Sequence, residues 1–178
     1  HYINHIMPVI KTILGHTPSI GKDSFIAENA TIVGQLTCGE GCSFWFGSVV
    51  RADVNAIVMG NKVNVQDNAT VHCTYEKYPT VIGNNVSIGH NAIVHGCRIE
   101  DNVLIGMGAI VMDNCVVEEG CIVAAGSVVT QGKRLTKGTL WAGVPAKELG
   151  LVPERLRTGE IERIANNYQK YSSWYDEK

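Results

Sequence analysis

The chain is poor in the features that mark several classes of protein. None of its apolar runs approaches the roughly 20 residues that a membrane-spanning helix needs. Its 178 residues carry a net charge of only −2, so we expect neither a nucleic acid nor a membrane as a partner. The 19 glycines show no G-X-Y repeat, which excludes collagen and suits a chain with many tight turns.

The sequence also lacks a CxxC pair and a recognisable signal peptide. Cys42, Cys115 and Cys121 fall at a position that small residues occupy elsewhere in the repeat described below. Reduced cysteine serves there as a small hydrophobe, so we expect reduced thiols and a cytoplasmic location. We also expect Met7 to be the natural first residue, so the histidines in residues 1–6 carry no functional weight.

Aliphatic residues recur at every sixth position through most of the chain. Neither the 3.6-residue period of an α-helix nor the two-residue period of a strand accounts for this spacing, whereas a hexapeptide β-helix does. The repeated positions are Ile20, Ile26, Ile32, Cys38, Phe44, Val50, Val65, Val71, Ile82, Ile88, Val94, Ile99, Ile105, Val111, Val117, Val123, Val129, Leu135 and Trp141. Each unit is then a short strand and a turn, and three units make one triangular turn of about 18 residues around an Ile and Val core.

The repeat predicts an all-β fold, a parallel β-helix with a C-terminal α-helix. We expect residues 1–19 to be an N-terminal segment and cap, 20–146 the hexapeptide repeat, and 147–178 a linker and amphipathic helix. From Thr158 the apolar residues are spaced 3-4-3-4, which is typical of a helix that packs along the repeat or a neighbouring subunit. The period does not fix handedness, and the general crossover rule favours a right-handed connection.

The larger interruption of the repeat lies between Val71 and Ile82. His72 and His95 each directly follow a repeated position, and they are 23 residues apart. That distance is one turn plus five residues, which the polar segment 73–79 accommodates as a loop. The two histidines should therefore stack on successive turns about 4.8 Å apart, close enough to share a metal ion.

His90 is in a different phase, two residues after Ile88, so it belongs to the preceding face. One subunit is not expected to close a three-histidine site, but His72 and His95 of one subunit and His90 of another could, and a threefold ring would make three such sites. The alternative for each histidine is a surface side chain at a turn. Three of them within 24 residues favour a metal site, since three neutral imidazoles and a water form a known catalytic zinc arrangement.

A second interruption lies between Val50 and Val65, which are 15 residues apart. Arg51 and Gln66 each follow a repeated position, so we expect them to stack on the face that His90 extends. The alternative for Arg51 is a surface pair with Asp53 that contributes under about 1 kcal/mol. A polar cluster that faces a candidate metal favours a functional role instead. Its side chains could orient a metal-bound water or hold a planar anion.

These motifs together resemble the gamma-class carbonic anhydrase family. The resemblance rests on Arg51-Ala52-Asp53, Asn64-Val65-Gln66-Asp67, His72, the run 82–90, His95-Gly96-Cys97 and the exit Ala142–Lys147. It implies a left-handed β-helix, a homotrimer, and zinc between subunits, with Fe²⁺ or Co²⁺ as alternatives in the native state. It also implies reversible hydration of CO2 to bicarbonate by a metal-bound hydroxide.

The resemblance assigns a role to each polar residue by motif position. His72, His90 and His95 would be the ligands, Asp53 and Gln66 would bind the metal-bound water, Arg51 and Asp67 would pair across the interface, and Asn64 would position CO2. Tyr168 aligns weakly with a tyrosine of the family's site. The chain departs from the family's best-characterised active pattern at Val54 and Tyr75, where that pattern has glutamates, so proton export should be impaired.

Three functions therefore stay open. The first is a trimeric metal-dependent carbonic anhydrase of modest rate, and the second is a catalytically silent, metal-binding trimeric scaffold. The third is a CoA-dependent acyltransferase, because hexapeptide β-helices also carry such enzymes. Acyltransferases use one histidine base and an extended groove, which fits the three clustered histidines poorly.

Overall fold

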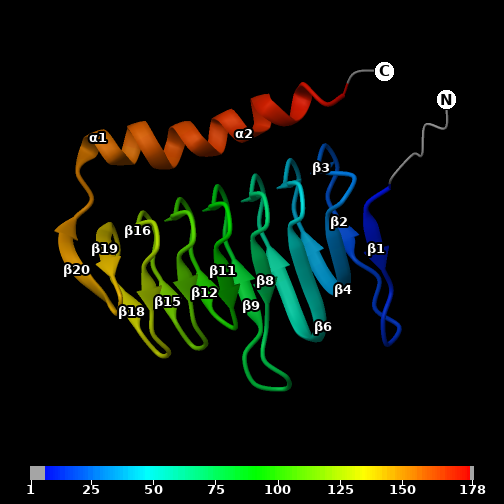
Figure 1. Ribbon diagram of the computed structural model, residues 1–178, viewed down its shortest axis with the longest axis horizontal. Coiled ribbons are helices and arrows are strands. Elements are labelled where there is room, and N and C mark those ends of the chain that lie inside the picture. The colour runs from blue at the N-terminus through cyan, green and yellow to red at the C-terminus, as the bar shows by residue number, and fades with distance from the viewer. Residues whose placement is uncertain (1–6, 177–178) are drawn as a thin grey trace.

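The computed structural model describes residues 7–176. They form a parallel β-helix of about seven turns with one helical segment along its side (Figure 1). The predicted all-β, hexapeptide-repeat fold with a C-terminal helix is confirmed. The histidines at positions 1 and 5 lie outside the described residues.

Each turn contributes one strand to each of three faces, which we name A, B and C. Face A contains β1 (Val9–Lys11), the first part of β4 (Thr31–Cys38), the first part of β6 (Val49–Met59), β8 (Thr70–His72), β11 (Ile93–His95), β14 (Ile110–Val111) and β17 (Val128–Val129). Face B contains β2 (Ser19–Ile20), the later parts of β4 and β6, β9 (Thr80–Ile82), β12 (Arg98–Ile99), β15 (Val116–Val117) and β18 (Arg134–Leu135). Face C contains β3 (Phe25–Ile26), β5 (Ser43–Phe44), β7 (Asn64–Val65), β10 (Ser87–Ile88), β13 (Leu104–Ile105), β16 (Ile122–Val123), β19 (Thr139–Gly143) and β20 (Ala146–Leu151).

The two ends of the repeat extend beyond the expected residues 20–146. β1 pairs in parallel with β4, so the ladder already includes Val9. At the other end β20 pairs antiparallel with β19 and closes the stack as a hairpin. Residues 147–151 thus belong to a strand and not to a linker. Reversal of direction at β20 ends the parallel ladder, since no further turn can add to it in the same way.

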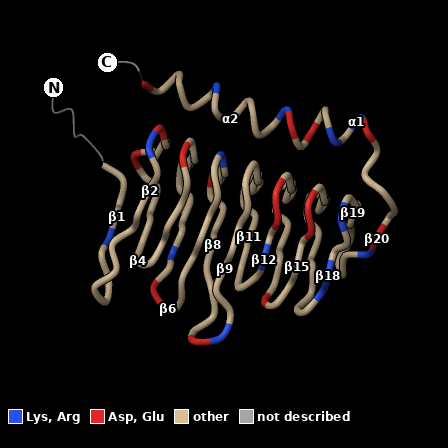
Figure 2. The backbone as a smooth tube through the Cα atoms, turned by 180° about the vertical axis from the view of Figure 1, so that it is seen from behind, with Lys and Arg blue, Asp and Glu red and all other residues tan. Residues whose placement is uncertain are grey.

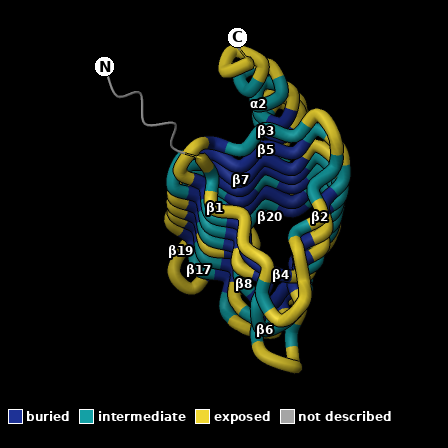
Figure 3. Tube along the Cα trace, turned by 90° about the vertical axis from the view of Figure 1, so that its right-hand side faces the viewer, coloured by how far each residue is buried: buried dark blue, intermediate teal, exposed yellow. Residues whose placement is uncertain are grey.

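The sixth-position residues form the inner column. Ile32, Val50, Val71, Val94 and Val111 stack on successive turns of face A, and all are fully buried. Seen along the stack, buried residues follow the faces of the β-helix, and exposed residues lie mostly at its corners and loops (Figure 3). The position that small side chains occupy in the repeat, such as Ala30, Ala69 and Ala92, is buried as well. All six cysteines are free and buried. The core is therefore one continuous apolar column, as the period predicts.

One expectation about the second interruption is wrong. Within β6, Ala52 and Ile57 are five positions apart, whereas their partners Gly34 and Leu36 in β4 are two positions apart. β6 therefore holds three extra residues, and the 15-residue gap spans two repeat units plus these three. Arg51 consequently lies on face A, whereas Gln66 lies on face C. The sequence alone could not show that the extra residues continue a strand.

The C-terminal segment lies over face C (Figures 1 and 3). It comprises α1 (Glu154–Leu156), a π-helical segment (Arg157–Glu162) and α2 (Arg163–Ser173). It begins before Thr158 because Pro153 occupies the N-cap position, where its fixed φ suits the start of a helix. The aromatic stripe packs on the β-helix, with the Tyr168 and Trp45 ring centroids 5.2 Å apart.

Charged residues of both signs are scattered along the corners of the β-helix and the C-terminal segment (Figure 2). In the part of the chain that the structure describes, no helix is long and apolar enough to cross a bilayer.

Candidate metal centre

Two of the three candidate histidines meet on face A. β8 and β11 are neighbouring parallel strands, and their pairing places His72 directly opposite His95. His72 Nδ1 lies 3.0 Å from His95 Nε2, with ring centroids 5.0 Å apart. The five-residue loop after His72 thus has the predicted effect of bringing the two imidazoles into register.

Each imidazole also contacts a carboxylate through its other ring nitrogen. His72 Nε2 lies 3.1 Å from Asp53 Oδ1, and His95 Nδ1 lies 2.5 Å from Asp113 Oδ1. Arg51 Nη1 donates to Asp53 Oδ2 at 2.7 Å, and Thr74 Oγ1 donates to Asp113 Oδ2 at 2.6 Å. Such carboxylate–histidine contacts fix the ring orientation of metal-binding histidines.

These contacts set the protonation of the cluster. Burial lowers the pKa of His72, and the nearby Arg51 adds to this effect against the opposing hydrogen bond to Asp53. Burial alone would raise the pKa of Asp53, but hydrogen bonds from Arg51 and His72 outweigh it and lower the value. The pKa of Asp113 is lowered likewise, because hydrogen bonds from Thr74 and His95 outweigh its burial. These shifts favour the neutral imidazole of His72 beside the ionised carboxylates of Asp53 and Asp113.

With both imidazoles in the neutral form that binds a metal, the cluster has fewer protons than acceptors. Neutral His95 that donates its Nδ1 proton to Asp113 carries a lone pair on Nε2. A neutral His72 has one N–H for two acceptors, His95 Nε2 and Asp53 Oδ1. One of these two contacts then has no hydrogen between its atoms. A cation would satisfy the remaining lone pair, so the donor set fits a metal such as zinc, which neutral imidazoles bind.

A buried hydroxyl fixes the backbone on which the pair is built. Thr80 Oγ1 donates to the carbonyl oxygen of His72 at 2.5 Å and accepts the N–H of Gly96 at 2.9 Å. Thr80 is fully buried on face B. It therefore ties the end of β8 to the end of β11, the points from which both imidazoles project.

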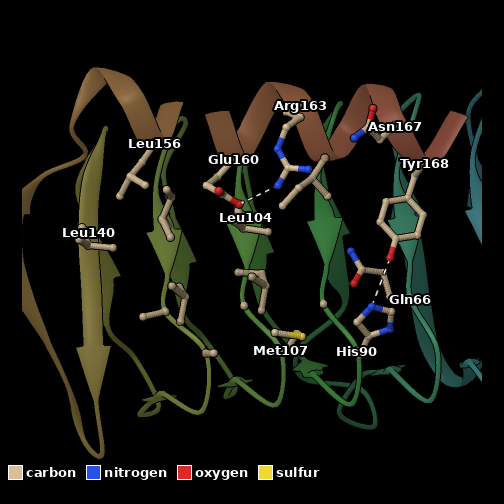
Figure 4. A pocket seen from close by; sticks show the side chains of 18 of the residues that line it. Gln66, His90, Leu104, Met107, Leu140, Leu156, Glu160, Arg163, Asn167 and Tyr168 are labelled. Carbon is tan, nitrogen blue, oxygen red and sulfur yellow. Dashed lines mark hydrogen bonds and ion pairs between the residues drawn. The ribbon is translucent and has the colours of Figure 1, made fainter. Parts of the chain in front are cut away.

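His90 lies elsewhere, at the corner between faces C and A. Its Nδ1 is 2.9 Å from Asp67 Oδ2, and its Nε2 is 3.4 Å from the hydroxyl of Tyr168. A cavity of about 540 Å³ separates the C-terminal segment from face C, and His90, Gln66 and Tyr168 lie at one end of it (Figure 4). The rest of the lining is mostly apolar, with Leu140 and Leu156 at the far end.

Asn64 and Gln66 form a buried chain of amides beside this cavity. Gln66 Nε2 donates to Asn64 Oδ1 at 3.0 Å, and Asn64 Nδ2 donates to Ser87 Oγ at 2.8 Å. Both amides are almost fully buried. The chain of donors fixes which way the Gln66 amide is turned, so its oxygen is the group left for another partner.

No group of three or more His, Cys, Asp or Glu side chains within residues 7–176 converges on a point that could hold a metal ion. The structure brings together Arg51, Asp53, His72 and His95 on face A. It places Asn64, Gln66, Asp67 and His90 on face C or its corner. Within one chain Arg51 pairs with Asp53 and not with Asp67. The expected pair between Arg51 of one subunit and Asp67 of another therefore stays a prediction.

Val54 and Tyr75 occupy the two positions at which the best-characterised active pattern of the family has glutamates. Tyr75 is 66% exposed in the loop after His72, and the neighbouring Glu76 is exposed as well. Val54 follows Asp53 in β6 and packs partly against the core. Neither position supplies an acidic side chain to the histidine pair.

The sequence did not single out Asp113, Thr74 or Thr80. Asp113 lies opposite Gly96, one residue past the position opposite His95, because β11 and β14 pair with a spacing of 17 residues (93 with 110). A search for polar residues one turn from each histidine could have found it. Thr80 gave no signal, since a threonine at a strand start is ordinary.

The fold and the in-register histidines define a hexapeptide-repeat β-helix protein with a pair of imidazoles on one face. A family model described as "Bacterial transferase hexapeptide (six repeats)" matches residues 96–131. An X-ray structure of a putative acetyltransferase from Bacillus cereus matches with a TM-score of 0.91 and 38% identity, over 94% of this chain and 96% of that one.

Two curated relatives carry a more specific name. A probable carbonic anhydrase of Methanocaldococcus jannaschii is 46% identical over 152 residues, which are 85% of this chain and 92% of that protein. Gamma carbonic anhydrase 1, mitochondrial, of Arabidopsis thaliana is 39% identical over 169 residues, 92% of this chain. The match spans 60% of that longer protein. The chain belongs to the gamma carbonic anhydrase-like family of hexapeptide-repeat proteins.

Proposed function

We propose that this chain is a subunit of a homotrimeric, metal-dependent carbonic anhydrase. His72 and His95 of one subunit and His90 of the next would hold zinc, with Fe²⁺ or Co²⁺ as alternatives. The observation that carries the proposal is the His72–His95 pair, whose strands are in register and whose facing ring nitrogens are 3.0 Å apart. The names of the relatives support CO2 and bicarbonate as substrates.

The surface of face A supports the sharing of a site between subunits. Ile93, Ile110 and Val128 project outward beside the histidine pair, and Ile93 is 38% exposed. An apolar strip at this place favours burial against a second copy. His90 lies at the adjacent corner, where a packed neighbour could present it to the pair. His90 keeps its ring oriented through Asp67.

A bound zinc ion supplies Lewis acidity that lowers the pKa of water to about 7. The chain's residues orient the reactants. Asp53 stays ionised, because its pKa is lowered, and its Oδ1 accepts hydrogen bonds and does not store a proton. Arg51 holds Asp53 in place from the solvent side. Asn64 fixes the Gln66 amide, whose oxygen is free to accept from water or another donor.

Export of the proton limits the proposed reaction. The described part of the loop and of β6 offers no carboxylate between the histidine pair and solvent at positions 54 and 75. Buffer would have to remove the proton directly. We therefore expect a modest turnover that rises with buffer concentration, because general acid–base groups contribute typically 10²–10⁴-fold.

The test is CO2 hydration and metal content on one anaerobically purified sample, with and without added zinc. We expect metal-dependent turnover, and its loss in His90→Ala. His16→Ala is the matched control, since His16 is exposed near the N-terminal end of the fold. Metal bound without turnover in any buffer would defeat the catalytic proposal and leave the scaffold.

The scaffold is thus the first alternative, and it predicts a trimer that dissociates when the metal is removed while no turnover is present at any stage. A second alternative, acyl transfer, is favoured by the cavity of about 540 Å³ beside His90 and by the name of the Bacillus cereus protein. Saturable binding of acetyl-CoA that Leu104→Arg in the cavity abolishes would support it. The six free thiols support a reducing, cytoplasmic location.

A further inference from the structure

Asp113 lies at the turn after β14, next to the histidine pair. Its Oδ1 is 2.5 Å from His95 Nδ1, and its Oδ2 accepts a hydrogen bond from Thr74 at 2.6 Å. Both oxygens of the carboxylate are therefore engaged. An ionised carboxylate only accepts hydrogen bonds, so the nitrogen that faces it must carry the proton.

The backbone opposite Asp113 is shaped for this contact. Gly96 has a φ of +55°, and a Cβ there would lie 2.4 Å from Asp113 Oδ1. The carboxylate thus occupies the space that any other residue at 96 would fill. The close approach of Asp113 to His95 depends on this glycine.

We infer that Asp113 is a positioning residue that holds His95 in its Nδ1–H tautomer and so leaves Nε2, the nitrogen facing His72, free to bind the metal. The tautomer follows from the contacts of this chain alone, whereas its use in metal binding rests on the proposed function. A neutral imidazole without this contact has no reason to keep its proton on Nδ1, and a proton on Nε2 blocks the ligand position.

The same carboxylate links the metal site to the loop after His72. Thr74 is the second residue of that loop, and its carbonyl oxygen accepts a hydrogen bond from Asn55 at 3.1 Å. The hydroxyl of Thr74 fills the second oxygen of Asp113. This contact holds the carboxylate at one rotation, so that Oδ1 points at the ring.

The experiment measures the His95 tautomer by long-range ¹H–¹⁵N NMR in metal-free protein and the zinc affinity by competition with a chelator. The wild type should show the Nδ1–H form. Asp113→Ala should move the proton largely to Nε2 and weaken zinc binding about 10–100-fold, the usual effect of losing such a partner. Asp113→Asn, which keeps the shape, should give a mixture of tautomers because its amide either accepts or donates.

Asp101→Asn is the matched control. Asp101 Oδ1 accepts the Asn84 backbone N–H at another corner, and Asn84 Oδ1 makes the equivalent contact with Asn61 one turn earlier. Asparagine therefore already performs this task in the fold, and Asp101→Asn should leave the tautomer and the zinc affinity unchanged.

An Nδ1–H tautomer that persists in both Asp113 variants, or zinc affinity within twofold of wild type in Asp113→Ala, would overturn the inference. A similar loss of zinc affinity in Asp101→Asn would overturn it as well, because the loss would then follow from changing an aspartate at any corner of the β-helix. If the tautomer responds as expected while the wild type binds no zinc, the proposed function fails and the tautomer assignment stands.

Discussion

At the scale of single residues, inward and outward positions of one strand have opposite roles. Ile57 and Val58 are neighbours in β6, yet Ile57 is fully buried and Val58 is 44% exposed. Ile57→Ala should lower the free energy of unfolding by about 2–5 kcal/mol, through lost burial and the cavity left behind. Val58→Ala should change it by less than about 1 kcal/mol. Urea denaturation measures both, and equal losses would contradict the assigned register.

Gly96 and Gly108 differ in what a side chain at each position would meet. Both have positive φ, but a Cβ at Gly108 would meet nothing within 4 Å, whereas at Gly96 it would collide with Asp113. Gly108→Ala should cost about 1–2 kcal/mol, the strain of a left-handed residue. Gly96→Ala should cost more and also weaken zinc binding. A smaller loss of unfolding free energy for Gly96→Ala than for Gly108→Ala would disprove the close approach.

Tyr168 gives a prediction about alkaline pH. Burial, together with the negative charge of Asp67, raises its pKa from 10.0 to about 12. A pKa raised on folding stabilises the fold fully below pH 10, and this stability is lost as pH rises through about 12. Tyr168→Phe should flatten the fall of stability across this range, measured by urea unfolding at each pH. An unchanged slope would mean that another group titrates there.

At the scale of elements, the C-terminal segment is held to face C by few buried side chains. Ile161 is 2% exposed and Ala165 is 6% exposed, while most of the remaining helix is at least partly open to solvent. Ile161→Ala should release the segment locally and speed its cleavage by protease, because local opening needs less free energy than global unfolding.

Arg155→Ala is the control for this change, since Arg155 is exposed on α1. The β-helix itself should resist cleavage in both variants. Cleavage within the turns before cleavage of the C-terminal segment would show that the segment is not the weaker element.

Elements also show what could and could not be predicted from sequence. The six-residue period gave the β-helix and its inner column, because every unit repeats the same burial. It placed His72 and His95 opposite each other, since the looped residues could be counted. It misplaced Arg51, because three extra residues extend β6 without a break in the strand. It missed Asp113, because contacts of a corner side chain depend on its rotamer and not on the period.

At the scale of the whole molecule, the metal site is expected to link subunits. His72 and His95 of one chain lie apart from His90 of the same chain, and the described residues of one chain contain no complete set of ligands. We expect zinc to raise the unfolding temperature and stabilise the trimer by mass action. Analytical ultracentrifugation with zinc and with a chelator measures this, and a zinc-loaded monomer would be incompatible with the shared site.

The most direct test mixes two kinds of defective subunit. His90→Ala keeps the histidine pair, and the double variant His72→Ala/His95→Ala keeps His90, so neither forms a site alone. In a ring of three, every mixed trimer contains one interface at which the pair meets an intact His90. Co-expressed and purified mixed trimers should therefore bind about one third of the wild-type zinc. No zinc in the mixed trimers, or full zinc binding by either homotrimer, would contradict a metal shared between subunits.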